Sequence, residues 1–295
     1  MKKEKTFLII IIIFLSIYFI FCYLNYSRDK DLKVYFLDSG QADTILIRSP
    51  EKKNILIDVG SEKGVKEIER VIPWWDKKIE IIIITHPHDD HISGIPLLLK
   101  KYEIDTIFFT GVFCDSPIYQ EVMKSIKEKE INLILPQKEQ IIEIEKNCLL
   151  YFIYPTENLW NKGAENLNNS SIVNKLVCKN KSFLFTGDIE EDAEKEILKN
   201  SFNIKSDVLK VPHHGSISST HQEFLNEVSP KISIIMVGKN NKHNHPSNRI
   251  INRLKKIGSE VFRTDLDGSI LIGSDGENLY SEKINQQKVY WPINF

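Results

Sequence analysis

The sequence contains few cysteines, which excludes a fold held together by many disulfide bonds. Only four occur in 295 residues, and Cys22 lies within a long apolar run near the N-terminus. The remaining three, Cys114, Cys148 and Cys178, are an odd number. We therefore expect no disulfide framework.

The chain also lacks an excess of charge of either sign. It has 39 Lys and Arg residues against 40 Asp and Glu residues, for a formal net charge of -1. This balance excludes a surface built throughout to bind a polyanion, although a local basic groove is compatible with it. The length and ordinary composition are typical of one large globular domain.

One apolar run stands apart from this composition, because residues 6–27 contain no charged side chain. At about 1.5 Å per residue, a helix over this run spans roughly 33 Å, enough to cross the hydrocarbon core of a bilayer. The bulky sequence Phe21-Cys22-Tyr23-Leu24 lacks the small residues of a signal-peptide cleavage site. We expect a tail at 1–5, an uncleaved single-pass anchor at 6–27, a tether at 28–32 and a folded domain at 33–295.

The orientation of this anchor follows from the charges beside it. Three lysines precede the run, and three basic residues follow it closely, so the side chains alone are balanced. The free amino terminus adds one positive charge before the run, which favours an inside N-terminus. We therefore expect a cell-membrane protein whose folded domain lies outside the cytoplasm.

Beyond the anchor, short apolar strands alternate with amphipathic helices, which predicts an α/β layered domain. The aspartates at the ends of the first three strands, Asp38, Asp43 and Asp58, occupy positions where carboxylates commonly cap turns. The expected strands lie at 33–38, 44–47, 54–58, 81–84, 106–109 and 132–135, in a hairpin ending at 154, in two strands joined at 180–181 (the first entered at 171–173, the second at 182–186), and at 207–211, 232–237, 260–265 and 268–272. Helices are expected from 94 to 101, at 65–72, at 118–129, starting at 190 and at 247–256.

Metal-ligand side chains follow the most apolar of these strands, in the segment from Thr85 to His91. His86 and His88 are two apart in an extended segment, so they point the same way and can bind one cation. Asp90 and His91 face a second position. A single histidine is usually structural, but three within six residues after a buried strand predict a metal site. Imidazole and carboxylate ligands without thiolate suit Zn, with Mn or Fe as alternatives.

The stretch resembles the Thr-His-x-His-x-Asp-His signature of the metallo-β-lactamase superfamily of hydrolases. Thr186-Gly187-Asp188, directly after an apolar strand, resembles the superfamily motif whose aspartate bridges two cations. Such a carboxylate holds the cations about 3.5 to 4 Å apart, a separation suited to two-metal hydrolysis. The resemblance implies two divalent metal ions, Zn or Mn.

Three further runs narrow the resemblance to the metallo-hydrolase domain of ComEC-type DNA-uptake proteins. They are Leu37-Asp-Ser-Gly-Gln-Ala-Asp43, Leu56-Ile-Asp-Val-Gly60 and Leu209-Lys-Val-Pro-His-His-Gly-Ser216. Ala42 stands where that family usually has glycine. The likeness covers about residues 33 to 273.

The resemblance implies roles for individual residues. Asp188 and one of His213 and His214 would be metal ligands beside the histidine motif, with the other of the pair facing substrate. Asp90 would be a ligand or the general base. His245, in a loop rich in Asn and Lys, would orient a phosphate or protonate the leaving oxygen, or else be a surface residue. Residues expected to bind substrate or support the ligands are Asp58, Asn168, Asn169, Ser216 and Asn244.

One feature of most superfamily members is missing from this chain. They have a histidine shortly before the Thr-Gly-Asp strand, where this sequence reads Asn166-Leu-Asn-Asn-Ser-Ser171. The first cation would then take a water or an Asn oxygen in its place. Oxygen ligation favours the harder Mn over Zn.

The fold implied is a four-layer αβ/βα sandwich of two mixed sheets, with helices outside. The activity implied is hydrolysis of phosphodiesters, with a metal-bound hydroxide as nucleophile and single-stranded DNA as substrate during DNA uptake. The alternative is an esterase that acts on phosphocholine or teichoic acid at the cell surface. Such an enzyme would use the same metal ligands. Stacking aromatics and basic residues would favour nucleic acid, and an aromatic cage would favour choline. A third alternative is a degenerate metal-binding module without catalysis. Nothing in the sequence predicts an obligate protein partner.

Overall fold

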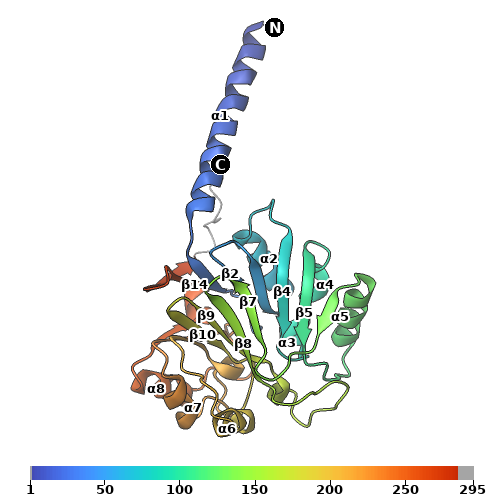
Figure 1. Ribbon diagram of the computed structural model, residues 1–295, viewed down its shortest axis with the longest axis vertical. Helices are drawn as coiled ribbons and strands as arrows, with labels where there is room; N and C mark the ends of the chain where they lie inside the picture. Colours follow the sequence, from blue (N-terminus) through green and yellow to red (C-terminus); the bar gives the residue numbers. More distant parts are fainter. Residues whose placement is uncertain (1, 285–295) are drawn as a thin grey trace.

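The computed structural model describes residues 2–284, with the side chains of residues 2–4 and 22–28 outside the description. Two β-sheets lie face to face, and helices cover the outer face of each (Figure 1). One sheet has eight strands in the order β15-β14-β1-β2-β3-β4-β5-β6, and the other has seven in the order β13-β12-β11-β10-β9-β8-β7. This arrangement confirms the predicted α/β sandwich of two sheets.

The strands of the first sheet are β1 (Leu32–Phe36), β2 (Thr44–Arg48), β3 (Asn54–Val59), β4 (Lys78–Ile84), β5 (Glu103–Phe109), β6 (Asn132–Ile134), β14 (Ser269–Ser274) and β15 (Leu279–Ile284). Those of the second are β7 (Ile141–Glu145), β8 (Cys148–Tyr154), β9 (Val173–Cys178), β10 (Lys181–Phe185), β11 (Val208–Lys210), β12 (Ile232–Ile235) and β13 (Glu260–Arg263).

Serine N-caps fix where three helices begin. Ser61, Ser116 and Ser247 each accept a hydrogen bond from a backbone N–H of the first turn, which satisfies a donor that the helix leaves unpaired. The helices are α1 (Lys2–Arg28), α2 (Glu62–Val71), α3 (Asp89–Ile92), α4 (Ile95–Leu98), α5 (Pro117–Glu128), α6 (Glu191–Lys199), α7 (Gln222–Val228), α8 (Asn248–Lys256) and α9 (Thr264–Asp267), with 3₁₀ turns at Asn168–Ser170 and Pro212–Gly215.

Strand alternation divides the core into three apolar layers. On β2, Ile45 and Ile47 face the second sheet, while Leu46 between them faces the helices on the outer side. The central layer joins the two sheets, the second packs the first sheet against α2, α4 and α5, and the third packs the other sheet against α6, α7 and α8. Each fully buried aliphatic side chain in these layers contributes about 1.5 to 3 kcal/mol of transfer free energy.

Parallel strands place the chemistry-bearing loops at one edge of the sandwich. In the first sheet β3, β4 and β5 run parallel, and in the second β10, β11 and β12 do so. Because parallel strands end at the same side of a sheet, the loops that follow them gather there. The segments after β3, β4, β10, β11 and β12 therefore meet at that edge.

The predicted elements match the observed ones, with three differences. Residues Thr264–Asp267 form the short helix α9 where the sequence predicted the end of a strand. Strand β15 and helix α7 are additions that the pattern did not predict. β15 is largely exposed, so its side chains carry little hydrophobic alternation.

Helix α1 projects from the body of the domain (Figure 1). Within the residues whose side chains the structure describes, no helix meets the length and hydropathy needed to cross a membrane. The side chains of residues 22–27, which belong to the predicted anchor, are not among those that the structure describes. The anchor and the domain boundaries drawn around it stay predictions.

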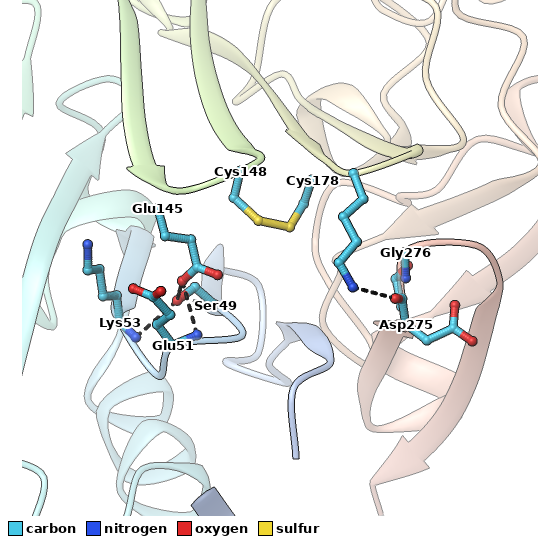
Figure 2. The surroundings of a disulfide bond; sticks show 10 residues. Ser49, Glu51, Lys53, Glu145, Cys148, Cys178, Asp275 and Gly276 are labelled. Atoms are coloured by element: carbon cyan, nitrogen blue, oxygen red, sulfur yellow. Dashed lines mark hydrogen bonds between the residues drawn. A yellow bond between two sulfur atoms is a disulfide. The ribbon is translucent and has the colours of Figure 1, made fainter. Parts of the chain in front are cut away.

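A disulfide bond links Cys148, the first residue of β8, to Cys178, the last residue of β9. The two residues face each other in the antiparallel register, with their Cα atoms 4.0 Å apart. Figure 2 shows the bond between the turn that carries Ser49 and Glu51 and the turn that carries Asp275 and Gly276. The sequence analysis expected no disulfide framework and did not anticipate this single bond, because pairing depends on strand register rather than on cysteine count.

Candidate metal centre

The segment after β4 turns sharply and gathers the histidine motif at the edge of the sandwich. His86 and His91 are completely buried, whereas His88 and Asp90 are partly exposed. His86 Nε2 lies 2.9 Å from His88 Nδ1, so the two rings converge as the sequence predicted. Helix α3 begins at Asp89 and points His91 back into the interior.

Asp58, at the end of β3, holds this segment in place. Its Oδ1 accepts a hydrogen bond from the Thr85 N–H at 2.8 Å, and its Oδ2 accepts one from the Thr85 hydroxyl at 2.7 Å. The same Oδ2 lies 2.7 Å from His91 Nδ1. A carboxylate can only accept, so Nδ1 carries the proton and Nε2 of the neutral ring is free to bind a cation.

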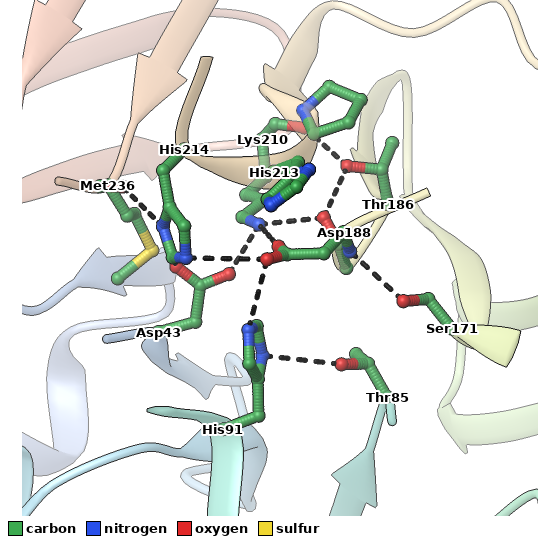
Figure 3. A network of polar contacts seen from close by, with 12 residues as sticks. Asp43, Thr85, His91, Ser171, Thr186, Asp188, Lys210, His213, His214 and Met236 are labelled. Atoms are coloured by element: carbon green, nitrogen blue, oxygen red, sulfur yellow. Dashed lines mark hydrogen bonds and ion pairs between the residues drawn. The ribbon is translucent and has the colours of Figure 1, made fainter. Parts of the chain in front are cut away.

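Asp188 lies at the centre of the site (Figure 3). Its Oδ2 is 3.3 Å from His91 Nε2 and 3.3 Å from His214 Nε2, so one oxygen faces both imidazoles. The turn before it requires glycine: Gly187 has φ +51, and a Cβ there would lie 2.7 Å from the Ser171 Cβ. Ser171 Oγ accepts the Asp188 N–H at 3.0 Å, which fixes the carboxylate at this point.

The two adjacent histidines after β11 point in different directions, with left-handed backbone at both residues. His214 is buried, and its Nδ1 donates to the Met236 carbonyl oxygen at 2.8 Å, which turns Nε2 toward Asp188. His213 faces the other way, with Nδ1 3.0 Å from Glu190 Oε1. Only His214 therefore has the geometry of a metal ligand.

Two residues of the site were missed by sequence reasoning. Lys210, the last residue of β11, is 1% exposed, and its Nζ forms ion pairs with Asp43 and, at 3.1 Å, with Asp188 Oδ1. It also donates to the Gly187 carbonyl oxygen at 2.8 Å. Asp43 is buried rather than capping an exposed turn, and its Oδ1 lies 3.5 Å from His214 Nδ1. A lysine in an otherwise apolar strand was the available signal, because a buried ammonium requires a carboxylate partner.

The carboxylates dominate the electrostatics of this cluster. Burial alone would lower the pKa of His91, but Asp188 and its neighbouring carboxylates outweigh it and raise that pKa well above its usual value. They raise the pKa of His214 to about 9 against the same burial effect. Burial would raise the pKa of Asp188, yet His214 and Lys210 hold it well below the usual range.

Asp90 has the character of a ligand more than of a base. Burial would raise its pKa, but His91 and His214 outweigh burial and lower that pKa far below the usual value. Its Oδ2 lies 3.4 Å from His214 Nε2. A general base works best with a pKa near the operating pH, so this carboxylate is poorly suited to take a proton.

The donor set fits a divalent metal. His91 Nε2 and His214 Nε2 are buried and make no hydrogen bond among the described residues, and both lie 3.3 Å from Asp188 Oδ2, an arrangement of donor atoms that suits a cation. One candidate ligand group consists of Asp90, His91 and His214, and another of His86, His91 and Asp188. Imidazole nitrogens and carboxylate oxygens of this kind bind Zn or Mn.

A cavity of about 450 Å³ opens beside this cluster. Of the residues predicted to handle substrate or support the ligands, it includes His245 and Asn168; Asp58 instead holds Thr85 and His91, and the other three lie outside the cavity. Asn169 accepts the Glu190 N–H through its side chain, Ser216 contacts Ser218, and Asn244 is exposed on its loop. The cavity is lined by Gln41, His88, Asp89, Asp90, Asn168, Asp188, His213, His214, His243 and His245.

His245 lies at the outer side of this cavity, beside two other histidines. Its ring is 5.6 Å from that of His213 and stacks at 5.6 Å on that of His243. Burial first, and then the nearby His213, His214 and His243, lower its pKa to about 4. The ring is therefore neutral at pH 7, which favours a hydrogen-bonding role over that of a proton donor.

Comparison with known proteins agrees with this geometry. Residues 37–108 match the family model described as the metallo-beta-lactamase superfamily. The chain is 29% identical over 280 residues to ComE operon protein 3 of Bacillus subtilis, covering 89% of this chain and 35% of that protein. It is 25% identical over 268 residues to the competence protein ComA of Neisseria gonorrhoeae, again covering 89% and 35%.

One further sequence match and one structural match concern a nuclease and the fold. A segment of 74 residues is 34% identical to exodeoxyribonuclease WalJ of Streptococcus pneumoniae, covering 25% of this chain and 28% of that protein. The crystal structure of the metallo-beta-lactamase fold protein YhfI from Bacillus subtilis superposes with a TM-score of 0.55 at 14% identity. The superposition covers 83% of this chain and 100% of the YhfI chain, and it supports a shared fold alone.

The fold, the donor set and these matches together define a class. The chain has the fold of the metallo-β-lactamase superfamily, matches its family model over residues 37–108 and carries a candidate divalent-metal centre. Within that superfamily it resembles the competence proteins, of which it spans about a third of the length.

Proposed function

We propose that this chain is a membrane-anchored two-metal phosphodiesterase that hydrolyses single-stranded DNA. The observation that carries the proposal is the position of Asp188, which shares one candidate ligand group with His86 and His91 and another with Asp43 and His214. A carboxylate that belongs to both groups could be shared by two cations. Paired cations bind the oxygens of a phosphodiester, offset its charge and lower the pKa of water, which is the chemistry that they would supply here.

In this proposal the ligands divide into two sets. His86 and His88 bind the first cation, with Asp188 shared. Asp90, His91 and His214 would hold the second, with Asp58 and the Met236 carbonyl oxygen fixing which ring nitrogen of His91 and of His214 faces that ion. The buried Asn168 Oδ1, which has no hydrogen-bond partner among the described residues, supplies an oxygen at the place of the missing histidine. Such a mixed oxygen and nitrogen set favours Mn over Zn.

The cavity lining favours a polyanionic substrate over choline. Choline recognition needs a cage of aromatic rings around the cation, and the ten described residues that line this cavity include no Phe, Tyr or Trp. Exposed aromatic side chains that could stack bases lie nearby instead. Phe113 follows β5 at this edge and is 54% exposed, and Trp160 packs on Gly111 and is 43% exposed. Relatives named as competence proteins and as an exodeoxyribonuclease support the same substrate class.

The experiment uses the full chain, purified in detergent and freed of metal with a chelator. Labelled single-stranded DNA, duplex DNA and a phosphocholine ester are each incubated with Mn or Zn. The proposal predicts cleavage of single-stranded DNA that requires added metal and is lost in Asp188→Asn. Cleavage of the choline ester without cleavage of DNA would favour the wall-polymer esterase. Metal binding without hydrolysis of any of the three would favour the non-catalytic module.

The proposed location is outside the cytoplasm, with α1 attached to the cell membrane. The Cys148–Cys178 bond supports this, because disulfides persist mainly in oxidising compartments. It adds an observation independent of the charges beside the apolar run. Protease added to intact cells should digest the domain, and protection of the domain would contradict the orientation.

A further inference from the structure

One long stretch of the chain carries several cations and no carboxylate. Residues 228–259 contain seven Lys and Arg residues and no Asp or Glu, although the whole chain has 39 basic and 40 acidic residues. The stretch includes β12, α8 and the loop 236–247 between them. That loop carries His243 and His245, which line the cavity beside the metal centre. Positive charge that is left unpaired in this loop therefore lies beside the place where the substrate would bind.

The loop 236–247 has a defined position at the rim of that cavity. Its last residue, Ser247, donates its N–H to the carbonyl oxygen of Gly215 at 2.9 Å, and Gly215 directly follows His214. Within the loop, the Asn241 side chain donates to the His245 carbonyl oxygen at 2.7 Å and accepts the His245 N–H at 2.9 Å. These bonds attach the loop to the segment that carries a metal ligand and hold its two arms together.

Contacts within the fold account for four of the seven cations. Lys231 forms an ion pair with a carboxylate at 2.8 Å, and Arg253 donates to a backbone carbonyl oxygen at 2.9 Å. Lys255 and Lys256 lie in the last turn of α8, where a cation is stabilised by the negative end of the helix dipole. None of these four requires a ligand to explain it.

The other three cations, Lys239, Lys242 and Arg249, have no such explanation. All three are exposed, and their side chains make no hydrogen bond or ion pair with any described residue. Arg249 lies in the first turn of α8, where the positive end of the helix dipole disfavours a cation. Its charge therefore does not serve the stability of the helix. We call Lys239, Lys242 and Arg249 the cationic lip.

The segments that come from other strands bring negative charge to the same cavity. Asp89 and Asp90 follow β4, Asp188 follows β10, and all three line the cavity. Metal ions at the candidate ligands Asp90 and Asp188 would offset their charge, but Asp89 is exposed and belongs to none of the candidate ligand groups. A chain of phosphates that extends beyond the metal centre is therefore repelled by Asp89 and attracted by the cationic lip.

We propose that the cationic lip binds phosphates of the substrate strand that neighbour the one held at the metal centre. The inference rests on the proposed hydrolysis of single-stranded DNA, and it adds the side of the cavity over which the strand extends. Every nucleotide contributes one phosphate charge, so a strand bound at the metals presents further phosphates to the rim of the cavity. Lysine and arginine side chains bind phosphates without reading the bases, so the contact is independent of sequence.

The first measurement is the affinity of the full chain, in detergent and with Mn, for a labelled oligothymidylate of about 20 nucleotides, which is longer than one strand-binding groove. All proteins carry Asp188→Asn, so that the strand stays intact. The lip is neutralised by Lys239→Gln, Lys242→Gln and Arg249→Gln together. Binding is followed by fluorescence anisotropy at salt concentrations between about 0.05 and 0.2 M.

The matched control removes three other exposed lysines through Lys127→Gln, Lys146→Gln and Lys205→Gln. Lys146 and Lys205 precede β8 and β11, and Lys127 lies in the last turn of α5, so all three lie away from the metal centre. A second lip variant, Lys239→Arg with Lys242→Arg, keeps the positive charge and should bind DNA as the parent protein does. It separates loss of charge from damage to the loop.

The expected result is that neutralising the lip lowers the slope of log Kd against log salt by about 2, because each lost phosphate contact removes about 0.7. The Kd at about 0.1 M salt should rise tenfold or more, and the control should change neither quantity by more than one contact would. With Asp188 restored, the ratio of kcat/KM for the oligonucleotide to that for a nitrophenyl ester of thymidine phosphate should fall by a similar factor, through KM.

Equal effects of the lip and control substitutions would mean that only the overall charge matters, and would overturn the proposal. Poly(glycerol phosphate) carries phosphodiesters without bases, so stronger lip-dependent binding of this polymer than of DNA would assign the lip to a wall polymer and also overturn it. Cleavage of DNA that does not depend on the lip would contradict the inference and leave the proposed activity standing. Lip-dependent binding of DNA by a chain that never cleaves it would support the lip and contradict the activity.

Discussion

Replacing Lys210 by methionine removes the ammonium group that pairs with both Asp43 and Asp188. Methionine keeps most of the volume of lysine, so the perturbation is mainly electrostatic. Both carboxylates are almost completely buried, with side-chain exposures of 2% and 3%. Without the ammonium they remain in a low-dielectric environment with two fewer ion pairs.

The expected loss of stability is large in the metal-free protein. Removing one partner of a buried ion pair costs about 3 to 5 kcal/mol, because the remaining charge is left uncompensated. A divalent cation bound to Asp188 supplies positive charge at the same place. We therefore expect the free energy of unfolding of Lys210→Met to fall by about 3 to 5 kcal/mol in chelator, and by less when Mn is present.

The assay is urea unfolding of both proteins, with chelator and with Mn. Lys231→Met is the matched control, since Lys231 forms an exposed ion pair with Asp207 at 2.8 Å, which is worth about 1 kcal/mol or less. Lys210→Arg keeps the charge and should retain more stability than the methionine variant. If Lys210→Met and Lys231→Met lose the same stability in chelator, the buried lysine does not have the role assigned to it.

Four further predictions follow from the site and the fold. His214→Ala should lose bound metal together with turnover while His213→Ala keeps metal near the wild-type level; equal metal contents by elemental analysis would reverse the assignment. His245→Ala should slow hydrolysis of DNA and of an activated nitrophenyl ester by similar factors of about ten, which corresponds to the loss of one hydrogen bond. The two factors should be similar because a ring with a pKa of about 4 is neutral at pH 7 and does not protonate the leaving group. A much milder effect on the activated ester would show that His245 is a general acid. Metal affinity should fall as pH is lowered from 9 to 6, since the cation must displace the proton that the raised pKa holds on His214; calorimetry showing no change would contradict the donor set. The Cys148–Cys178 bond closes a loop of about 30 residues, so reducing it should lower the free energy of unfolding by about 3 kcal/mol. An unchanged urea midpoint after reduction would mean that the bond adds no stability.

Local patterns were enough to predict most of the fold. The isoleucine run of β4 predicted a buried strand, and its abrupt end in histidines predicted a site at the edge of a sheet. The apolar run at 44–47 predicted β2, whose Ile45 and Ile47 share one face as strand alternation requires. Elements without such a pattern were not predicted. β15 is an example, because its side chains are mostly exposed and show little hydrophobic alternation.

Contacts between distant segments could not be predicted in the same way. Lys210 meets Asp43 across 167 positions and from the opposite sheet, which only the packed sandwich reveals. The choice between His213 and His214 depends on left-handed backbone at both residues, with φ of +47 and +52. The disulfide depends on the register of β8 and β9. Each follows from the tertiary structure rather than from residue type and spacing.

The most direct test of the central claim is single-turnover cleavage of single-stranded DNA by the full chain, followed as Mn is added to metal-free protein. The account predicts no cleavage without metal and a rate that reaches its maximum when about two ions are bound per chain, as expected for paired cations bridged by one carboxylate. Asp188→Asn should show neither the second ion nor the cleavage. Cleavage that persists in chelator, or that is complete with one ion bound, would contradict a two-metal phosphodiesterase centred on Asp188.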